Sequence, residues 1–597
     1  MVDFAFDDTY FDASFVRRRR FEGPIAVWRA TTLIDVVPVL DEVDRAARAG
    51  RWVVGYVAYE SAPAFDSAFA SIPTHPLPLA WFAAFNAPAG QATDPDENDG
   101  SAVSQELPAL APSSVVRDTD HADAVRRIHE HIAAGDVYQV NLTVPFTAGL
   151  SMPPFVFYER MRRAQGGRYS CYLDIGEAHI LSASPELFFE RRGSLVRSRP
   201  MKGTATRALY PAADLAAAEA LLRSEKDRAE NVMIVDVVRN DLGRVADVGS
   251  ISVGALCEPE RYPSVWQLTS TVEAAVDASR SLADLFRALF PPASITGAPK
   301  IRATEIIRDL EGAPRGVYCG AIGVVRPGGD ATFNVAIRTA WTASGSGTLH
   351  LNAGGGITAD STARGELGEV AAKLDAFTRQ VPLAGLFETI RIEDGRCVRL
   401  ERHLARLRAS ADYFDVPFHR TAALAVLDEG IATSPAARGV ARARLELART
   451  GAFSATIAAH RDYVGEEPVP VRVATTPVDA SDVRLYHKTT DRRLYDDALA
   501  AAPGAFDVVL WNSAGFATEL TRGNLVAELD GARLTPPIDC GLLAGTFRAE
   551  LLERGAIREA VLSLDDLRRA ERLWFVNSLR GWVRIFLAPF DRANGVP

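Results

Sequence analysis

A chain of 597 residues is too long to fold around one hydrophobic core, because single cores stop growing at about 250–300 residues. We therefore expect several domains, and the sequence offers one clear junction. The helix-like stretch VAAKLDAFTRQ is followed almost directly by the strand-like stretch LFETIRI. We predict a first module made of residues 1–115 and 116–378, and a second module over 383–597. Residues 87–114, rich in Pro, Gly, Ser and acidic residues, are predicted to be a mobile linker.

Within the first module, the spacing of apolar residues alternates between helical and strand patterns. The mixture predicts an α+β multidomain protein. The predicted helices cover residues 33–49, 121–134 and 215–241, and the predicted strands cover 52–59, 180–190 and 316–325.

The charge and the cysteines exclude several classes of partner. The formal net charge is −10, so no basic field attracts nucleic acid or an anionic membrane, and the run Arg17–Arg20 is short enough to be a solvated face. The five cysteines are scattered and form no CxxC pair, which favours a reducing compartment. We find no apolar signal core at the N-terminus and no stretch long enough to span a membrane. A cytoplasmic protein is expected.

Acidic residues and a lysine stand at unusual places in the first module. Glu186 ends a strand pattern in SASPELFF, and Lys202 lies between a proline and a glycine in SRPMKGTATR. Glu230 lies on an apolar helix, and Glu366 and Glu369 lie one turn apart on another. Buried carboxylates are costly unless they hold a cation, so these glutamates suit an oxygen-lined Mg²⁺ site. Spacing alone favours surface ion pairs for these glutamates and a surface position for Lys202.

Five further segments join these residues in one order along the chain. They are GDVYQVNLT (135–143), ITGAPKIRATE (295–305), YCGAIGVV (318–325), FNVAIRTA (333–340) and NAGGGIT (352–358). With these segments, residues 130–376 resemble the chorismate-utilising enzymes, a group that includes anthranilate synthase, isochorismate synthase and aminodeoxychorismate synthase component I. The resemblance implies a fold of two large, mainly antiparallel sheets with flanking helices.

Lys202 is the residue that separates members of this group. The segment from Pro200 to Thr204 reads PMKGT and matches the P-I-K-G-T motif of aminodeoxychorismate synthases, with Met in place of Ile, whereas anthranilate synthases carry alanine at the lysine. The resemblance implies that Lys202 attacks carbon C2 of chorismate while Glu186 protonates the departing C4 hydroxyl, and that ammonia then adds at C4. This chemistry needs a neutral amine and a protonated carboxyl, so burial must lower the pKa of the lysine and raise that of the acid.

The same resemblance implies the rest of the site. Arg338 pairs with a substrate carboxylate, Thr296 lies in the substrate pocket, and Glu230, Glu366 and Glu369 bind Mg²⁺. A loop formed by Gly354, Gly355 and Gly356 presents backbone N–H groups to a carboxylate. One departure is Gln267, which replaces a histidine of many relatives, so an acid–base role is not carried over to it.

The source of ammonia lies outside the chain. None of its cysteines stands in a G-x-C-x-G turn, so no glutaminase nucleophile is present. Ammonia is expected from solution or from a separate glutamine amidotransferase subunit.

The second module contains a different set of motifs, each weak when taken alone. In this order and spacing they resemble fold-type IV pyridoxal phosphate enzymes, and aminodeoxychorismate lyase most closely. The residues are Arg406 in RLERHLARLRAS, Lys488 in LYHKTTDRRLY, Glu519 and Asn524 in FATELTRGNLVAEL, Gly545 and Thr546 in PPIDCGLLAGTFR, and Asn577 in VNSLRGW.

The resemblance implies a role for each main residue of this module. Lys488 binds the cofactor covalently and moves protons, Glu519 pairs with the pyridine nitrogen, and Arg406 with the turn at Gly545 and Thr546 binds the phosphate. The strand and turn that usually precede the F-E-T-I-R strand are missing here or replaced by the first module. This departure puts part of the substrate pocket, and the usual dimer contact of a possible homodimer, in doubt.

Two consecutive reactions follow from the two resemblances. The expected protein aminates chorismate and then eliminates pyruvate, giving 4-aminobenzoate for folate synthesis. Two alternatives stay open: the second module is an aminotransferase for D-amino or branched-chain acids, or it is inactive and serves for docking. Motifs that bind a cofactor cannot separate the two enzyme alternatives, because they hold the cofactor and not the substrate.

Overall fold

The computed structural model describes residues 1–7, 16–73, 75–91, 112–378, 385–461 and 467–588. They form two compact units. Unit 1 contains Met1–Arg207 and Ala217–Val381, and unit 2 contains Ala208–Ala216 and Pro382–Pro597. Most of the predicted linker 87–114 lies outside the described residues.

Two large antiparallel sheets form the centre of unit 1, as predicted. The first has the order β18-β8-β22-β21-β10-β9-β1-β2-β6, with β7 beside β8, and the second has the order β14-β17-β12-β11-β20-β19-β4-β5-β3. A third, small sheet has the order β13-β16-β15. The bounds in the first sheet are β1 Val2–Asp7, β2 Val16–Phe21, β6 Gly90–Gln91, β7 Ser113–Ser114, β8 Gln139–Gly149, β9 Tyr169–Asp174, β10 Ala178–Ser184, β18 Gly297–Ala298, β21 Thr339–Ala343 and β22 Thr348–Ile357. Those in the other two are β3 Ala26–Ala30, β4 Trp52–Val57, β5 Ala80–Phe85, β11 Leu187–Arg192, β12 Leu195–Arg199, β13 Met201–Thr206, β14 Ser252–Val253, β15 Glu258–Arg261, β16 Val265–Thr269, β17 Val272–Ala275, β19 Ala321–Val325 and β20 Ala331–Val335.

Strand β4 shows why the two large sheets stack. Successive side chains of a strand point to opposite faces, so the sequence WVVGYV offers apolar groups to both. Val53 and Val57 pack against the helical layer, whereas Val54 and Tyr56 pack against the other large sheet. A strand that is apolar on both faces is stable only between two layers, which explains why β4 lies inside the unit.

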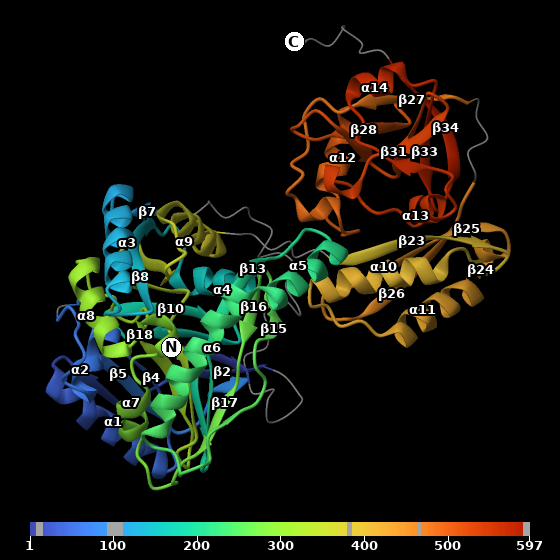
Figure 1. Cartoon of the computed structure of the whole chain (residues 1–597). Helices are drawn as coiled ribbons and strands as arrows, with labels where there is room; N and C mark the ends of the chain where they lie inside the picture. Colours follow the sequence, from blue (N-terminus) through green and yellow to red (C-terminus); the bar gives the residue numbers. More distant parts are fainter. Residues whose placement is uncertain (8–15, 74, 92–111, 379–384, 462–466, 589–597) are drawn as a thin grey trace. The chain divides into compact units, whose positions relative to one another are not determined.

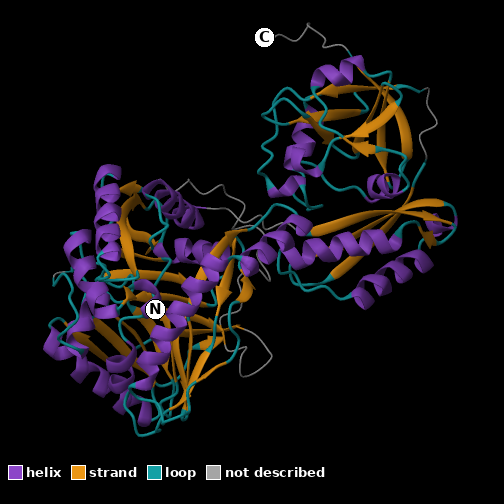
Figure 2. Cartoon of the chain, in the orientation of Figure 1, coloured by secondary structure: helices purple, strands orange, loops and turns teal. Residues whose placement is uncertain are grey.

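Helices cover the outer faces of these sheets (Figure 2). Helix α1 places Val36, Leu40 and Val43 on the nine-stranded sheet, and α4 packs on the ten-stranded one. The bounds are α1 Leu33–Arg48, α2 Ala62–Phe65, α3 Asp118–Ala133, α4 Pro154–Gln165, α5 Pro211–Arg223, α6 Glu225–Gly243, α7 Leu282–Leu289, α8 Lys300–Glu311 and α9 Ala363–Thr378.

The predicted helices 33–49 and 121–134 and the predicted strand 52–59 correspond to α1, α3 and β4, but three other predictions were partly wrong. Segment 180–190 is two strands, β10 and β11, because Pro185 between them has no N–H for the ladder. Segment 215–241 is two helices, because the Ser224 hydroxyl accepts from Asp227 N and starts α6 anew. In segment 316–325 only β19 is a strand; Gly316 and Cys319 have positive φ and turn the chain before it.

Unit 2 is an α/β module built on two sheets. In the four-stranded sheet β24-β23-β25-β26, helices α10 and α11 share an apolar core with the strands (Figure 1). The other sheet, β29-β28-β27-β34-β33-β30-β31-β32, mixes parallel and antiparallel pairs. The strands are β23 Leu386–Glu393, β24 Arg396–Cys397, β25 Val440–Leu447, β26 Phe453–Ala459, β27 Val469–Val473, β28 Asp507–Trp511, β29 Ala517–Leu520, β30 Asn524–Leu529, β31 Ala532–Thr535, β32 Arg558–Glu559, β33 Arg572–Asn577 and β34 Gly581–Leu587. The helices are α10 Leu400–Tyr413, α11 Arg420–Thr433, α12 Arg493–Ala500, α13 Thr546–Glu553 and α14 Leu564–Arg569.

Candidate active sites

Lys202 lies on β13, at an irregularity of the small sheet. The register between β13 and β16 shifts between Met201 and Thr204, so Lys202 and Gly203 form a bulge. Gly203 has φ +92°, and a Cβ there would lie 3.0 Å from the Cβ of Asp227. The glycine after the lysine is therefore required by the backbone. A bulge redirects the side chain beside it, and here that side chain is Lys202.

Charged side chains from two helices and a loop surround Lys202. Burial lowers the pKa of Lys202, and the nearby ammonium of Lys373 lowers it further, whereas Glu230, Glu369 and Glu186 act in the opposite direction. The net effect is a lowered pKa. The structure thus brings the predicted lysine together with three of the four glutamates chosen from the sequence, and burial favours its neutral amine.

Glu186 follows β10 and is 3% exposed. Burial raises its pKa to about 7, although Ser294 and Lys202 act to lower it. The backbone holds the residue in place: Glu186 N donates to Ser184 Oγ at 3.2 Å, and Val335 N donates to Glu186 O at 3.0 Å. A carboxyl group that stays partly protonated at neutral pH beside an amine has the properties of a general acid.

The three consecutive glycines lie on strand β22, not in the predicted loop. Gly354, Gly355 and Gly356 pair with Thr143, Leu142 and Asn141 of β8. The surrounding atoms leave no room for a side chain at these three positions. A Cβ would lie 2.1 Å from Leu142 O at Gly354, 2.9 Å from Glu366 Oε2 at Gly355, and 2.8 Å from Lys202 Nζ at Gly356. The strand backbone therefore forms a wall of the site, which lies against the acids at Gly355 and against the lysine at Gly356.

The paired glutamates of α9 face this wall. Burial raises the pKa of Glu366, and its Oε2 atom is buried with no hydrogen-bond partner among the described residues. Burial also acts to raise the pKa of Glu369, but Lys373 outweighs it and the pKa is lowered. Lys373 Nζ lies 2.7 Å from Glu369 Oε1 and donates to Gly354 O at 2.6 Å, so a cation already stands in this acidic corner.

The acids around Lys202 fit Mg²⁺ only in part. In the part of the chain that the structure describes, no three His, Cys, Asp or Glu side chains converge closely enough to hold a metal ion. Glu366 and Glu369 nevertheless lie together over Gly355, with one carboxylate oxygen unpartnered. Mg²⁺ takes one or two protein carboxylates and keeps several waters, so this pair fits the ion. The participation of Glu230, whose pKa is raised by burial, stays a prediction.

Arg338 and Thr296 differ in whether their side chains are free to bind a substrate. Arg338 NH1 donates to Gln165 Oε1 at 2.6 Å, and no ion pair with a carboxylate is found for it within the described ranges. Burial lowers its pKa to about 10, so its guanidinium is a buried cation without an acid, as a carboxylate-binding residue would be. The Thr296 hydroxyl donates to the carbonyl oxygens of Pro292 and Ala293, which is a structural use.

Gln267 has a structural partner. Its Oε1 accepts from Thr204 Oγ1 at 3.2 Å across the β13–β16 pair. This contact fastens the strand that carries Lys202 and needs no proton transfer.

Gln139 is a site residue that the sequence analysis did not single out. A Cβ added at Gly356 would lie 1.7 Å from Gln139 Nε2 as well as close to Lys202, so the amide and the amine are neighbours. Gln139 is 1% exposed, and its Oε1 has no hydrogen-bond partner among the described residues. In the sequence, only its position within the motif GDVYQVNLT pointed to Gln139. Nothing distinguished it from the other residues of that motif.

The second site, in unit 2, is centred on Lys488. Its backbone is fixed by β23, because Phe387 N donates to Lys488 O at 2.9 Å and Thr490 N donates to Gly385 O at 2.8 Å. Lys488 Nζ lies 4.6 Å from the centre of the Phe387 ring. Burial lowers the pKa of Lys488 to about 7, and Arg406 contributes in the same direction. An amine that is partly neutral at pH 7 can react with an aldehyde.

Glu519 is the only acid that we predicted for this site. Burial raises its pKa to about 8, although Tyr495 acts to lower it. Tyr495 OH donates to Glu519 Oε1 at 2.9 Å. A buried carboxyl group without a bonded cation suits the protonated ring nitrogen of pyridoxal phosphate. Tyr495 was missed in the sequence, where it stands as one aromatic residue of a helix.

Arg406 is held by a buried acid that the sequence analysis also missed. Both Glu388 oxygens accept from Arg406, at 2.8 and 2.7 Å, and His403 Nδ1 lies 2.7 Å from Glu388 Oε2. Glu388 is 1% exposed. Burial acts to raise its pKa, but Arg406 and His403 outweigh it and lower the pKa to about 2. The sequence signal was a glutamate within the apolar strand LFETIRI.

The predicted phosphate turn lies next to Arg406. Arg406 NH1 donates to Ala544 O at 3.0 Å, directly before Gly545, which is the N-cap of α13. A Cβ at Gly545 would lie 2.0 Å from Asn524 Oδ1, so the turn leaves no room for a side chain. Thr546 Oγ1 lies 3.3 Å from His403 Nε2. A guanidinium and a helix N-terminus together suit a phosphate.

The two asparagines of these motifs support turns. Asn524 Nδ2 donates to Leu543 O at 2.8 Å. Asn577 Oδ1 accepts from Leu579 N and Arg580 N, which closes the turn between β33 and β34.

The folds and sites of the two units define a chain that joins a chorismate-type fold to a pyridoxal phosphate-type α/β module. Residues 22–379 match the family model of the chorismate binding enzymes, and the chain belongs to that family. Residues 385–586 match the family of class IV amino-transferases.

Relatives of the first unit carry two different names. Aminodeoxychorismate synthase component 1 of Klebsiella aerogenes is 41% identical over 264 residues, which are 44% of this chain and 58% of the relative. Anthranilate synthase component 1 of Streptomyces coelicolor is 42% identical over 260 residues, 43% of this chain and 50% of the relative. The chain thus matches little more than half the length of these proteins.

A solved structure shares the fold of the first unit. Anthranilate synthase component I of Streptococcus pneumoniae matches with a TM-score of 0.50 and 24% identity, over 64% of this chain and 90% of the other. This likeness concerns the fold alone. Since the similar relatives include both synthase types at nearly equal identity, the choice between them depends on the site residues.

Proposed function

We propose that the chain makes 4-aminobenzoate in two steps, amination of chorismate in unit 1 and elimination of pyruvate in unit 2. The observation that carries this proposal is Lys202, a buried amine with a lowered pKa between Glu186 and the glutamates of α6 and α9. A nucleophilic lysine at this place serves the amination that goes through a covalent intermediate.

In the first step, the neutral Lys202 amine forms a bond to C2 of chorismate while both ring double bonds shift, from C1=C2 and C5=C6 to C1=C6 and C4=C5, and the C4–O bond breaks. Glu186 gives its proton to the departing oxygen, which leaves as water. Ammonia then bonds to C4, the lysine leaves C2 with its electron pair, and the new ammonium group returns a proton to Glu186. The sum is chorismate plus ammonia giving 4-amino-4-deoxychorismate plus water.

The other residues of unit 1 bind and orient the substrate. Arg338 offers a buried guanidinium to a substrate carboxylate, and the β22 wall lets the ring approach Lys202 because it carries no side chains. Mg²⁺, held by Glu366 and Glu369, would supply positive charge for a second carboxylate. Gln139 contributes an unpartnered amide oxygen beside Lys202.

In unit 2, pyridoxal phosphate would supply an electron sink when bound. Lys488 holds the cofactor and then takes the proton from the substrate carbon. Glu519 keeps a proton at the ring nitrogen, and Arg406 with the turn at Gly545 and Thr546 holds the phosphate. Arg444 lies 4.1 Å from the Phe387 ring, which Lys488 also contacts, and its Nε is paired with Glu446 Oε1, so its guanidinium already has an acidic partner. Loss of pyruvate makes the ring aromatic and drives the reaction.

The test supplies the full chain with chorismate, ammonium, Mg²⁺ and pyridoxal phosphate. We expect 4-aminobenzoate and pyruvate in equal amounts. Lys488→Ala is expected to stop at aminodeoxychorismate, because amination does not use that lysine. Glutamine should replace ammonium only when a separate amidotransferase subunit is added.

Other products would contradict the proposal in identifiable ways. Anthranilate as the product would refute the role of Lys202. Conversion of an amino acid and 2-oxoglutarate to a keto acid and glutamate would make unit 2 an aminotransferase. A chain that aminates chorismate but takes up no cofactor would make unit 2 a docking module.

A further inference from the structure

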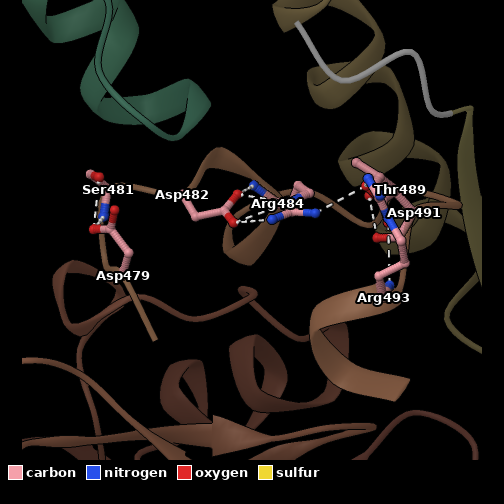
Figure 3. A network of polar contacts seen from close by, with 7 residues as sticks. All are labelled: Asp479, Ser481, Asp482, Arg484, Thr489, Asp491 and Arg493. Atoms are coloured by element: carbon pink, nitrogen blue, oxygen red, sulfur yellow. Dashed lines mark hydrogen bonds and ion pairs between the residues drawn. The ribbon is translucent and has the colours of Figure 1, made fainter. Parts of the chain in front are cut away.

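The loop that carries Lys488 is closed on itself by charged side chains (Figure 3). Arg484 stands four residues before Lys488 and donates to Asp482 through Nε and NH2, at 3.0 and 2.7 Å. Through NH1 it donates to Asp491 Oδ2, three residues after Lys488, at 3.0 Å. One guanidinium therefore joins the two ends of the segment that presents the lysine.

Both carboxylates are themselves fixed to the backbone. Asp482 Oδ1 accepts from Arg484 N at 2.9 Å and caps the short 3₁₀ helix Val483–Leu485. Asp491 Oδ1 accepts from Arg493 N at 3.2 Å, at the start of α12. Because each carboxylate is anchored to the backbone, the Arg484 bridge between them sets the distance between the 3₁₀ helix and α12.

These ion pairs are shielded more than ordinary surface pairs. The side chains of Arg484, Asp482 and Asp491 are 26%, 17% and 15% exposed. Hydrogen bonds to Arg493 and Arg484 lower the pKa of Asp491, and the hydrogen bond to Asp482 raises that of Arg484. The planar guanidinium of Arg484 donates two N–H groups to the Asp482 carboxylate, and this bidentate contact has a fixed geometry that an isolated surface ion pair lacks.

We infer that Arg484 is a positioning residue of the Lys488 site: by bridging Asp482 and Asp491 it fixes the loop that presents the lysine to the cofactor. The loop is thus held in two ways, by backbone hydrogen bonds to Gly385 and Phe387 and by the Arg484 bridge. The arginine touches neither cofactor nor substrate in this role. The inference rests on the proposed cofactor chemistry of unit 2.

The experiment uses the full chain, stripped of cofactor and titrated with pyridoxal phosphate. Arg484→Ala is expected to weaken cofactor binding about fivefold, equivalent to roughly 1 kcal/mol, and to shift the pH midpoint of the cofactor's absorbance band. Asp491→Asn, which keeps the shape of the side chain, should act in the same direction. Arg484→Lys keeps the charge without the bidentate contact and should restore only part of the affinity.

Arg493→Ala is the matched control. Arg493 also contacts Asp491, at 2.9 Å, but its side chain is 69% exposed and it belongs to α12 itself. It should leave the affinity and the pH midpoint close to those of the wild type.

Three results would overturn the inference. Wild-type affinity in Arg484→Ala would do so, as would equal losses in Arg484→Ala and Arg493→Ala. Lower thermal stability of the cofactor-free variant without any change in affinity or pH midpoint would show a merely structural role. A wild-type chain that binds no pyridoxal phosphate would instead refute the proposed function of unit 2, and this inference with it.

Discussion

At the scale of single residues, unit 1 depends on two groups whose protonation differs from that in water. Burial lowers the pKa of Lys202 and raises that of Glu186 to about 7. The two groups interact electrostatically, so each also stabilises the charged form of the other. The reaction needs both in their neutral forms, and desolvation is the effect that supplies them.

The rate of amination should therefore depend on pH in a bell-shaped manner. At pH values above 7 at which the Lys202 amine is neutral, Glu186 loses the proton that it must donate, so kcat/KM for chorismate should fall up to tenfold per pH unit. Below the lowered pKa of Lys202 the amine is charged, and the rate should fall again. The measurement keeps free ammonia constant. Glu186→Gln should lose the alkaline limb together with most of its activity, and an alkaline limb that persists unchanged in this variant would contradict the role of Glu186.

Glu388 should stabilise unit 2 through charge. Its pKa is lowered from 4.5 to about 2, so the stabilisation is present above pH 4.5 and is lost as the pH falls through 2. At pH 7, Glu388→Gln leaves Arg406 buried without its acid and should destabilise the unit by about 3 kcal/mol. Thermal unfolding measures the effect.

The control for this variant is Glu401→Gln. Glu401 pairs with Arg420 at the surface, where its side chain is 74% exposed, and removal of that charge should cost less than about 0.5 kcal/mol. Equal unfolding temperatures of the two variants would show that the Glu388 pair contributes no more than a surface pair.

At the scale of elements, strand β22 and the bulge of β13 bring the site together. The bulge directs Lys202, and the glycines of β22 leave the space that its amine occupies. Lys202, Glu186 and Glu369 could be proposed as site residues from the family resemblance of the motifs that contain them, whereas their spacing alone was also compatible with surface positions. The strand conformation of Gly354–Gly356 could not, because glycine has a low strand propensity and only pairing with β8 overrides it.

Gly356→Ala tests the wall directly. The added methyl group would meet Lys202 Nζ and the Gln139 amide, so we expect amination to fall about a hundredfold from misplacement of the amine. Gly149→Ala, on the paired strand β8 with open space around its Cα, should keep the wild-type rate. Similar rates in both variants would contradict this description of the wall.

At the scale of the whole molecule, two compact units each contain one candidate site. The pairing of strands that lie far apart in the chain could not be predicted from local sequence patterns. Strand β1 pairs with β9 and β4 with β19, so residues from both predicted parts of the first module share its sheets. The break at Ser224 could have been found from the capping pattern Ser-x-x-Asp. Nothing in the sequence indicated that Ala208–Ala216 belongs to unit 2, because its contacts there, such as Tyr210 with Asp539, join residues far apart in the chain.

The most direct test of the central claim is the amination rate of Lys202→Ala at saturating chorismate and constant free ammonia. If Lys202 forms the bond to the substrate, the rate should fall about a thousandfold or more, equivalent to about 4 kcal/mol of transition-state stabilisation, while the cofactor absorbance of unit 2 stays unchanged. A rate within a few-fold of the wild type would show that amination proceeds without the lysine, and the account of unit 1 would be wrong.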